Sequence, residues 1–474
     1  MTATHVSRAG GLQRGLTRLL FASAAGLAAA IGLTSHTLAD STPIVEQTFD
    51  NGDGAHRTVS AAGAIDRDNP FFEDLGTNGR RCVTCHQSAE GWTITPGGVQ
   101  ARFDATSGLD PIFRTVDGSN CAAEETSTIE QRRVAYSQLL EKGVIRIDLD
   151  VPAQAEFLIE SVDDPHDCGA PLTGASMFRR PLPTSNLGFL STVMWDGRHT
   201  IAGHAIRDGL LAQASEATVR HAEGVPPSPS QVRAIVDFEL GLFTAQLRDK
   251  QAGPLGERNA RGGPRPLSHE PFCVGINDPL GMLPAMPDAC GVVTGFDPKV
   301  FTLFSGWSEA PSPERQAIAR GEAIFNTRQF AITNVPGLNG KASDPLQAPL
   351  TAGTCTVCHD TPNAGNHSVS MPLDIGITAA SRRAPDVPLY TLRHLQTGET
   401  VQTTDPGRAM VTGRWDDISK FKGPILRALA SRAPYFHDGS ASSLEDVIAF
   451  YDTRFLIGFT ASEKADLLAF LRAL

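Results

Sequence analysis

Hydrophobic and polar residues repeat with a helical period in several separate stretches of the chain. A Ser-x-x-Glu pattern, typical of helix N-termini, begins at Ser127 and precedes apolar residues at helical spacing. The stretch 230–247 is amphipathic, and residues 312–325 have the composition of a helix. Two further capping patterns predict helices that begin at Ser442 and Thr460.

A shorter part of the chain alternates as strands do. Residues 144–149 and 156–162 partly alternate, which predicts two strands paired as a small β-hairpin. Residues 40–70 are polar and rich in Gly and Asp, which predicts an extended lead-in. Residues 249–311 are rich in Pro and Gly, which predicts a linker or covering loop between two mostly helical parts.

The N-terminus has the pattern of a secretory signal peptide. Three arginines precede the apolar run 19–33, and small residues around Ala39 offer a cleavage site. The run is shorter than the ~20 apolar residues that a membrane-spanning helix needs. We therefore expect residues 1–39 to be a signal peptide on an exported protein without a membrane span, with a retained anchor as the alternative.

Charge and cysteine content fit export. The net charge of −11 argues against nucleic acid as a partner, because phosphate binding needs a basic face. Outside the cytoplasm, thiols either pair or bind a cofactor. Of the eight cysteines, four belong to a repeated motif. The other four allow three pairings, of which the most local joins Cys121 to Cys168 and Cys273 to Cys290.

The repeated motif is Cys-x-x-Cys-His. In a helical turn these positions lie on neighbouring flanks, so two thiols can bond to one edge of a haem while the imidazole coordinates its iron. With 8 Cys and 13 His in the chain, a chance copy is expected roughly 0.004 times. Two copies therefore predict two covalently bound haem c groups. The copies comprise Cys82, Cys85 and His86, and Cys355, Cys358 and His359.

Zinc and redox chemistry are the competing interpretations of these cysteines. Two Cys-x-x-Cys pairs could supply four thiolates to a zinc ion, and one pair could act as a redox dithiol. Neither interpretation gives a reason for a histidine at the same offset in both copies. The motif therefore favours haem.

Three further stretches resemble one family. MWDGRH (194–199), FKGPILRALASRAPYFHDGS (421–440) and LEDVIAFYD (444–452) are similar to the bacterial dihaem cytochrome c peroxidase family, which includes the methylamine-utilisation dihaem oxidases. The resemblance covers roughly residues 70–474. It implies a mainly α fold with two cytochrome c-like haem domains, long loops and the small β-hairpin as an insertion.

The resemblance also implies a domain order. We expect an N-terminal peroxidatic haem domain with an insertion over residues 40–248. Residues 249–311 form the linker or covering loop, and residues 312–474 form a C-terminal electron-transfer cytochrome domain.

Two residues near the MWDGRH stretch match family functions. Trp195 resembles the tryptophan that lies between the two haems in the family and would relay electrons; core packing is its alternative role. Glu216 stands at the offset of the family's distal glutamate, which would move the proton when peroxide is split. His199 and His204 are substitutes for that role.

The sequence gives a different expectation for each iron about the ligand on the side of the haem opposite the motif histidine. No histidine occurs between His86 and His166, so the resemblance implies a first haem without a nearby histidine cap and with an open iron. Family peroxidases use a methionine on the second haem, and the methylamine-utilisation branch uses a tyrosine. Met410 is the leading candidate here, and Tyr435 and His437 are its rivals.

The function expected from these residues is reduction of hydrogen peroxide to water in the periplasm, with electrons from a small cytochrome c or cupredoxin. The alternatives are peroxide-driven oxidation of a partner protein or organic molecule, and a dihaem electron carrier without chemistry at the iron. Calcium binding and a homodimer are expected from the family only.

Overall fold

The computed structural model describes residues 46–169, 171–281 and 295–474. The expected signal peptide and Cys290 lie outside these residues. None of the helices in the described ranges is long and apolar enough to cross a membrane.

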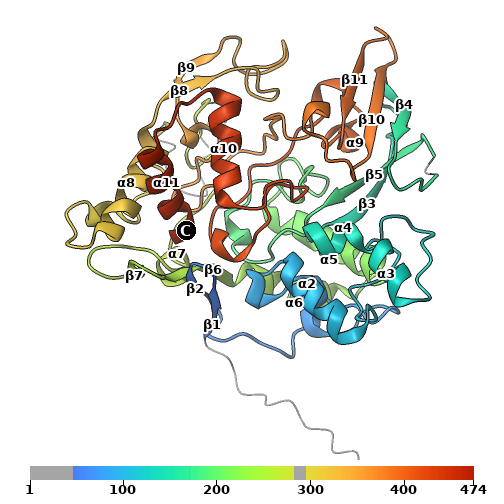
Figure 1. Cartoon of the computed structure of the whole chain (residues 1–474), viewed down its shortest axis with the longest axis horizontal. Helices are drawn as coiled ribbons and strands as arrows, with labels where there is room; N and C mark the ends of the chain where they lie inside the picture. Colours follow the sequence, from blue (N-terminus) through green and yellow to red (C-terminus); the bar gives the residue numbers. More distant parts are fainter. Residues whose placement is uncertain (1–45, 170, 282–294) are drawn as a thin grey trace, which may run out of the picture. The chain divides into compact units, whose positions relative to one another are not determined.

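Helices α8, α10 and α11 lie side by side, although α8 is more than 100 residues before α10 in the chain (Figure 1). Most of the described α-helices begin at a Ser or Thr whose side chain accepts a hydrogen bond from the first helical turn. The α-helices are α1 (Cys82–Cys85), α2 (Pro96–Thr106), α3 (Ile129–Ala135), α4 (Ser137–Lys142), α5 (Ile206–His221), α6 (Pro229–Leu240), α7 (Pro264–Leu267), α8 (Pro313–Thr327), α9 (Ala409–Thr412), α10 (Leu444–Phe455) and α11 (Ala461–Ala473).

The expected mainly α fold is wrong. The described residues are 31% helical and 17% strand, and the strands form four sheets, in the orders β1-β2-β6-β7, β11-β10-β4, β3-β5 and β8-β9. Local periodicity missed these sheets because many of their strands are short, and because the β2–β6 and β4–β10 pairings join segments far apart in the chain. The strands are β1 (Glu46–Asn51), β2 (Gly54–Ser60), β3 (Ile145–Asp150), β4 (Phe157–Asp163), β5 (Gly174–Arg179), β6 (Leu242–Asp249), β7 (Gly253–Pro254), β8 (Phe330–Ile332), β9 (Leu350–Gly353), β10 (Leu389–His394) and β11 (Thr400–Thr403).

The predicted β-hairpin is also wrong, although both of its strands exist. Strand β3 pairs with β5, and β4 pairs with β10 more than 220 residues later in the chain. The connection between β3 and β4 contains Pro152 and no glycine, so it lacks the residues of a tight hairpin turn. Strand β4 instead buries Phe157 and Ile159 in one cluster with Tyr390 of β10.

Two further expectations about local structure are corrected. The lead-in at residues 46–60 is not simply extended, because it forms the β1–β2 hairpin, which pairs with β6. The helix expected over residues 230–247 ends at Leu240, and β6 begins at Leu242. Helix α8 and helix α11, which is capped by Thr460, lie where the sequence predicted them.

Two large apolar clusters lie around the two haem motifs. The first contains Phe71, Trp92 and Val236. The second contains Phe304, Trp307 and many residues of α8, α10 and α11. Since Phe304 and Trp307 come from the Pro/Gly-rich stretch, part of that stretch packs into the core of the second half.

The disulfide predicted between Cys121 and Cys168 is confirmed, with a Cα–Cα distance of 5.3 Å. Cys273 also forms a disulfide, and its expected partner Cys290 lies outside the described residues. The four motif cysteines are free thiols. The structure therefore separates structural cysteines from those of the two motifs.

Candidate functional site

The two Cys-x-x-Cys-His motifs adopt the same backbone turn. In each, the backbone N–H of the histidine donates to the carbonyl of the first cysteine, at 3.0 Å for His86 and 3.1 Å for His359. Helix α1 carries the first motif, and a single 3₁₀ turn at Cys355–Val357 carries the second. This turn brings the two thiols and the imidazole of each motif to one side of the backbone.

Both motif histidines are held in the tautomer that a metal ligand needs. Nδ1 of His86 lies 3.1 Å from the carbonyl oxygen of Trp92, and Nδ1 of His359 lies 2.7 Å from that of Gly365. A neutral ring that donates through Nδ1 carries its lone pair on Nε2. Burial lowers the pKa of each histidine to about 4, so both rings stay neutral at pH 7.

All six motif residues line one cavity of about 390 Å³. Burial raises the pKa of Cys82 and Cys358 to about 12. Among the described residues, no three His, Cys, Asp or Glu side chains converge to hold a metal ion directly. The residues therefore fit two covalently attached haem groups better than a shared four-cysteine zinc site.

Trp195 lines the same cavity as both motifs. Its indole Nε1–H donates to the carbonyl oxygen of Arg180 at 2.9 Å, and its ring lies 6.3 Å from the ring of His437. Its backbone carbonyl accepts from the N–H of Lys422 at 2.9 Å. These contacts hold the indole ring in one orientation.

A buried ion cluster lies beside Trp195. Arg179 of β5 binds Asp405 through two hydrogen bonds of 2.7 and 2.9 Å and also pairs with Asp196. All three side chains are at most 4% exposed. Burial raises the pKa of Asp196, but the charges of Arg179 and Arg198 outweigh it and lower that pKa to about 2. Through Arg179 the cluster therefore connects Asp196, the residue after Trp195, to Asp405 in the second half of the chain.

His437, a rival candidate for the second iron, lies next to this cluster. Its ring stacks on Phe421 with a centroid distance of 4.1 Å, and its Nε2 lies 3.5 Å from Asp405. Neither ring nitrogen forms a hydrogen bond with another described residue, and burial lowers the pKa of His437. His437 is thus a neutral imidazole at the wall of the cavity.

Glu216 and its two substitutes do not line the cavity. The carboxylate of Glu216 is bound by His199 and, at 2.7 Å, by Nε of Arg220. The hydrogen bond from His199 lowers the pKa of Glu216 to about 2. His204 is exposed and lies 3.3 Å from Asp208. The structure therefore does not bring these three side chains together with the first motif.

Met410 and Tyr451 differ in their relation to the second motif. Met410 is buried in the cluster that contains Phe157 and Tyr390, and it does not line the cavity. Tyr451, which sequence reasoning missed, lines the cavity with its ring centroid 6.5 Å from that of His359. Its position in the LEDVIAFYD stretch was the only signal that could have indicated it.

The hydroxyl groups of the two cavity tyrosines are used differently. Tyr435 donates its hydroxyl to the carbonyl oxygen of Leu429 at 2.9 Å. The hydroxyl of Tyr451 forms no hydrogen bond with any residue in the described ranges. Burial is the main reason that the pKa of Tyr451 is raised. Of the two, Tyr451 has the phenol oxygen free to bind another group.

Two other ionisable side chains of the cavity wall were not singled out by the sequence. Glu239 of α6 is 4% exposed, its Oε2 has no hydrogen-bond partner among the described residues, and burial raises its pKa to about 8. His221, the last residue of α5, lines the cavity near the first motif. No motif signals either residue, because each reaches the cavity only through the packing of its helix.

Comparison with known proteins supports the family resemblance over part of the chain. No family model matches the chain. The protein named cytochrome-c peroxidase IdrP1 from Pseudomonas sp. (strain SCT) is 32% identical over 140 residues, which are 25% of this chain and 36% of the relative. Cytochrome-c peroxidase IdrP2 from Denitromonas iodatirespirans is 30% identical over 151 residues, 29% of this chain and 40% of the relative.

The chain thus matches well under half the length of these curated relatives. A solved structure described as a MauG-like protein associated with microbial copper homeostasis aligns over 86% of both chains, with 15% identity and a TM-score of 0.40. Over these 140–151 residues the chain is similar to proteins named cytochrome-c peroxidase, the family that its motifs resemble.

Proposed function

We propose that the chain is a dihaem c-type oxidoreductase that reduces hydrogen peroxide to water in the periplasm, with electrons from a small cytochrome c or cupredoxin. The observation that carries this proposal is the single cavity lined by both Cys-x-x-Cys-His motifs and by Trp195. The relatives named cytochrome-c peroxidase support it. Calcium binding and a homodimer stay predictions.

The residues of this chain supply attachment and orientation. Cys82, Cys85 and His86 would hold the peroxidatic haem, and the second motif would hold the electron-entry haem. When bound, haem supplies an iron that can take up peroxide and exchange single electrons. The carbonyl groups of Trp92 and Gly365 fix the ring orientation of the two ligand histidines.

Trp195 is the proposed stepping stone for electrons between the two sites. Its ring lines the shared cavity, and both its indole N–H and its backbone carbonyl are hydrogen-bonded. An aromatic ring held in this way keeps a constant position between donor and acceptor. Glu216 stays a prediction for the acid/base group, but its low pKa and its position off the cavity give it no support.

For the far side of the second iron, the geometry favours Tyr451 over Met410. The Tyr451 ring faces His359 across 6.5 Å, and its hydroxyl is free of hydrogen bonds to the described residues. Tyr451→Phe should change the absorption and resonance Raman spectrum of one haem. Tyr435→Phe is the matched control, because the hydroxyl of Tyr435 is bound to Leu429. If Met410→Ala altered the haem spectrum and Tyr451→Phe did not, Met410 rather than Tyr451 would be the ligand of the second iron.

The test of the proposed function is a steady-state assay of the purified two-haem protein with hydrogen peroxide and reduced cytochrome c. Peroxide-dependent oxidation of the cytochrome is the expected result. A carrier without chemistry at the iron would show no turnover, and both irons would be low-spin by electron paramagnetic resonance.

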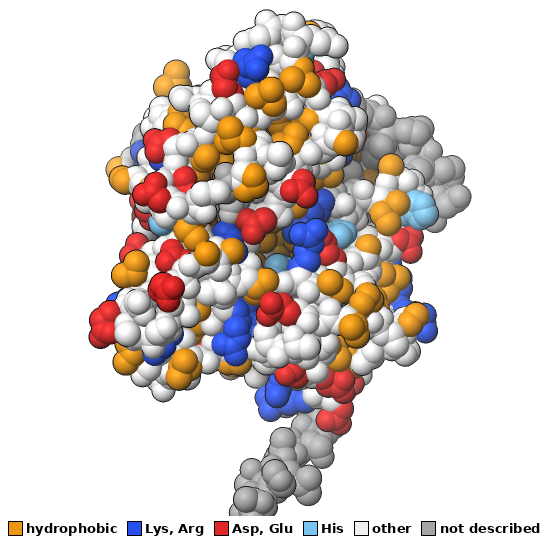
Figure 2. All heavy atoms as spheres, turned by 90° about the vertical axis from the view of Figure 1, so that its right-hand side faces the viewer, with side chains coloured by type: hydrophobic (Ala, Val, Ile, Leu, Met, Phe, Trp, Pro, Cys, Tyr) orange, Lys and Arg blue, Asp and Glu red, His pale blue; other side chains and the backbone are white. Residues whose placement is uncertain are grey.

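One observation favours the second candidate function, peroxide-driven oxidation of a partner protein or organic molecule. A tyrosine opposite His359 matches the ligand expected from the methylamine-utilisation branch. In that case peroxide would be consumed slowly with reduced cytochrome c and faster with the true substrate. The face shown in Figure 2 carries acidic, basic and apolar side chains interspersed, which suits contact with another protein better than with nucleic acid.

A further inference from the structure

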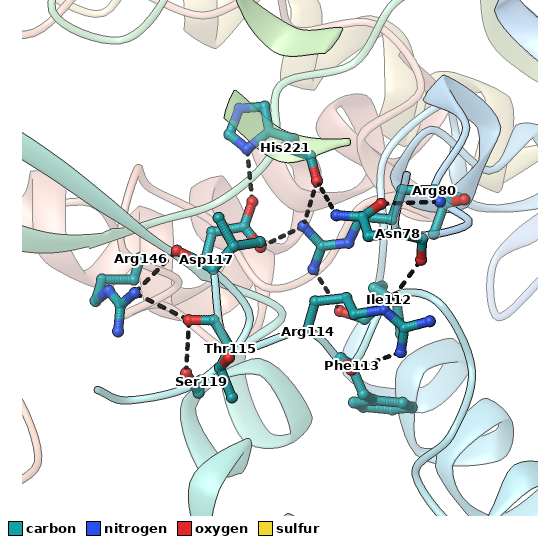
Figure 3. A network of polar contacts seen from close by, with 12 residues as sticks. Asn78, Arg80, Ile112, Phe113, Arg114, Thr115, Asp117, Ser119, Arg146 and His221 are labelled. Carbon is teal, nitrogen blue, oxygen red and sulfur yellow. Dashed lines mark hydrogen bonds and ion pairs between the residues drawn. The ribbon is translucent and has the colours of Figure 1, made fainter. Parts of the chain in front are cut away.

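His221 belongs to a three-residue network next to the first motif (Figure 3). Its Nδ1 lies 2.6 Å from Oδ2 of Asp117, and Oδ1 of the same carboxylate lies 2.5 Å from Nη1 of Arg80. Asp117 is 5% exposed and Arg80 is 3% exposed. The imidazole is therefore backed by a buried carboxylate, which is itself neutralised by a buried guanidinium.

Backbone carbonyl groups hold Arg80 in place. Its Nε donates to Pro111 at 2.9 Å, its Nη2 donates to Ile112 at 2.7 Å, and its Nη1 donates to the carbonyl of His221 at 3.1 Å. Arg80 thus ties the C-terminus of α5 to the residues directly before Cys82. Because one side chain reaches both elements, the network fixes His221 relative to the first motif.

The charge state of the network suits a histidine that handles protons. Burial raises the pKa of Asp117, but the charge of Arg80 and the hydrogen bond from His221 outweigh it and lower that pKa. An ionised Asp117 accepts the Nδ1–H of His221, so a neutral His221 carries its lone pair on Nε2. Nε2 forms no hydrogen bond within the described ranges, and His221 lines the cavity that His86 also lines.

We propose that His221 is the proton-transfer residue of the peroxide reaction, and that Asp117 and Arg80 are the positioning residues that hold its Nε2 at the first site. This inference rests on the proposed function and replaces Glu216 in the acid/base role. His221 lines the cavity, whereas Glu216 does not.

The proton balance of the step is simple. Nε2 takes the proton of one peroxide oxygen and returns it to the other oxygen, which leaves as water when the O–O bond breaks. The remaining oxygen becomes a second water with two electrons from the donor protein and two protons from solvent. His221 therefore ends the cycle unchanged.

The experiment compares the purified two-haem protein with His221→Gln, Asp117→Asn and Glu216→Gln. His269→Gln is the matched control, because His269 is an exposed histidine away from the cavity. Three quantities are measured: kcat/KM for peroxide, the rate constant of hydrogen cyanide binding followed by haem absorbance, and the electron paramagnetic resonance spectrum of the oxidised protein. Hydrogen cyanide must also lose a proton to bind, so its rate reports the base without turnover.

We expect His221→Gln to lower kcat/KM and the cyanide rate by ~10²–10⁴-fold, the usual contribution of a positioned acid/base group. Asp117→Asn should lower both by at least ~10-fold, because an amide favours the wrong tautomer. The resonance spectrum should stay unchanged in both variants, and His269→Gln should match wild type.

Three results would overturn the inference. They are an unchanged cyanide rate in His221→Gln, a larger loss in Glu216→Gln than in His221→Gln, and a low-spin to high-spin change in His221→Gln, which would make His221 an iron ligand. A wild-type protein that does not reduce peroxide would refute the proposed function instead. In that case the cyanide rates still decide the role of His221.

Discussion

Glu239 should make the protein less stable as the pH rises through neutrality. The side chain is 4% exposed, and its Oε2 has no hydrogen-bond partner among the described residues. Burial raises its pKa from the ordinary 4.5 to about 8. In the unfolded chain the same carboxyl group ionises near 4.5 and is solvated by water. The folded state must therefore keep a proton that the unfolded state releases.

The sign and size of the effect follow from this difference. Because the folded pKa is raised, stability is complete below pH 4.5 and is lost as the pH rises towards about 8. Each pH unit in this window costs about 1.4 kcal/mol, so the loss at pH 7 is about 3 kcal/mol. Glu239→Gln keeps the size of the side chain and carries no titrating proton. It should therefore stabilise the protein by about 3 kcal/mol at pH 7 and have almost no effect near pH 4.5.

The assay is guanidinium chloride unfolding of the haem-containing protein at pH 5, 6, 7 and 8, followed by far-UV circular dichroism. The free energies of unfolding of the two proteins should diverge steadily from pH 5 to pH 8. Glu141→Gln, at an exposed position on α4, is the control and should follow the wild-type curve at every pH. Parallel curves for wild type and Glu239→Gln would refute the reasoning, since they would mean that Glu239 is ionised in the folded protein.

Three further predictions concern the disulfide, the ion cluster and the haem sites. Replacing Cys121 and Cys168 together by Ser opens a crosslink with a sequence separation of 47 and should lower the free energy of unfolding by ~4 kcal/mol; an unchanged denaturation midpoint would contradict this. Arg179→Met leaves the buried Asp405 without its guanidinium partner and leaves Asp196 paired with Arg198 alone, and it should cost about 3–5 kcal/mol. Arg179→Lys should cost less, and equal losses would argue that packing rather than charge matters. Replacing Cys355 and Cys358 together by Ser should leave the haem of the second site without a thioether bond, so acid–acetone extraction should release pigment from this variant and none from wild type.

The sequence predicts a feature of this fold well when the residues that specify the feature lie close together along the chain. The capping pattern at Thr460 was located correctly because the cap and its partner lie three residues apart. Two other caps were placed one residue too early: the structure uses Thr128 and Ser443, because adjacent hydroxyl residues fit the same pattern and only the backbone conformation decides. The β2–β6 and β4–β10 pairings escaped detection because each joins strands that lie far apart in the chain.

The residues of the candidate site likewise divide into those that a local sequence pattern predicts and those that only the folded structure brings to the cavity. The six motif residues fall in two copies of one five-residue pattern, so their spacing alone singles them out. His221 and Tyr451 belong to helices, and their roles depend on which helix face meets the cavity. That choice is made by tertiary packing, which a single sequence does not express.

The pairing of β4 with β10 has a consequence for how the chain reaches its native state. The two strands are joined by more than 220 residues, so one edge of β4 stays unpaired until residues 389–394 have been made. At ordinary synthesis rates this takes roughly 10–45 s, during which an exposed edge strand invites association with other chains. Separate production of either half should for the same reason give aggregated material, and holdase chaperones should raise the yield of the intact polypeptide.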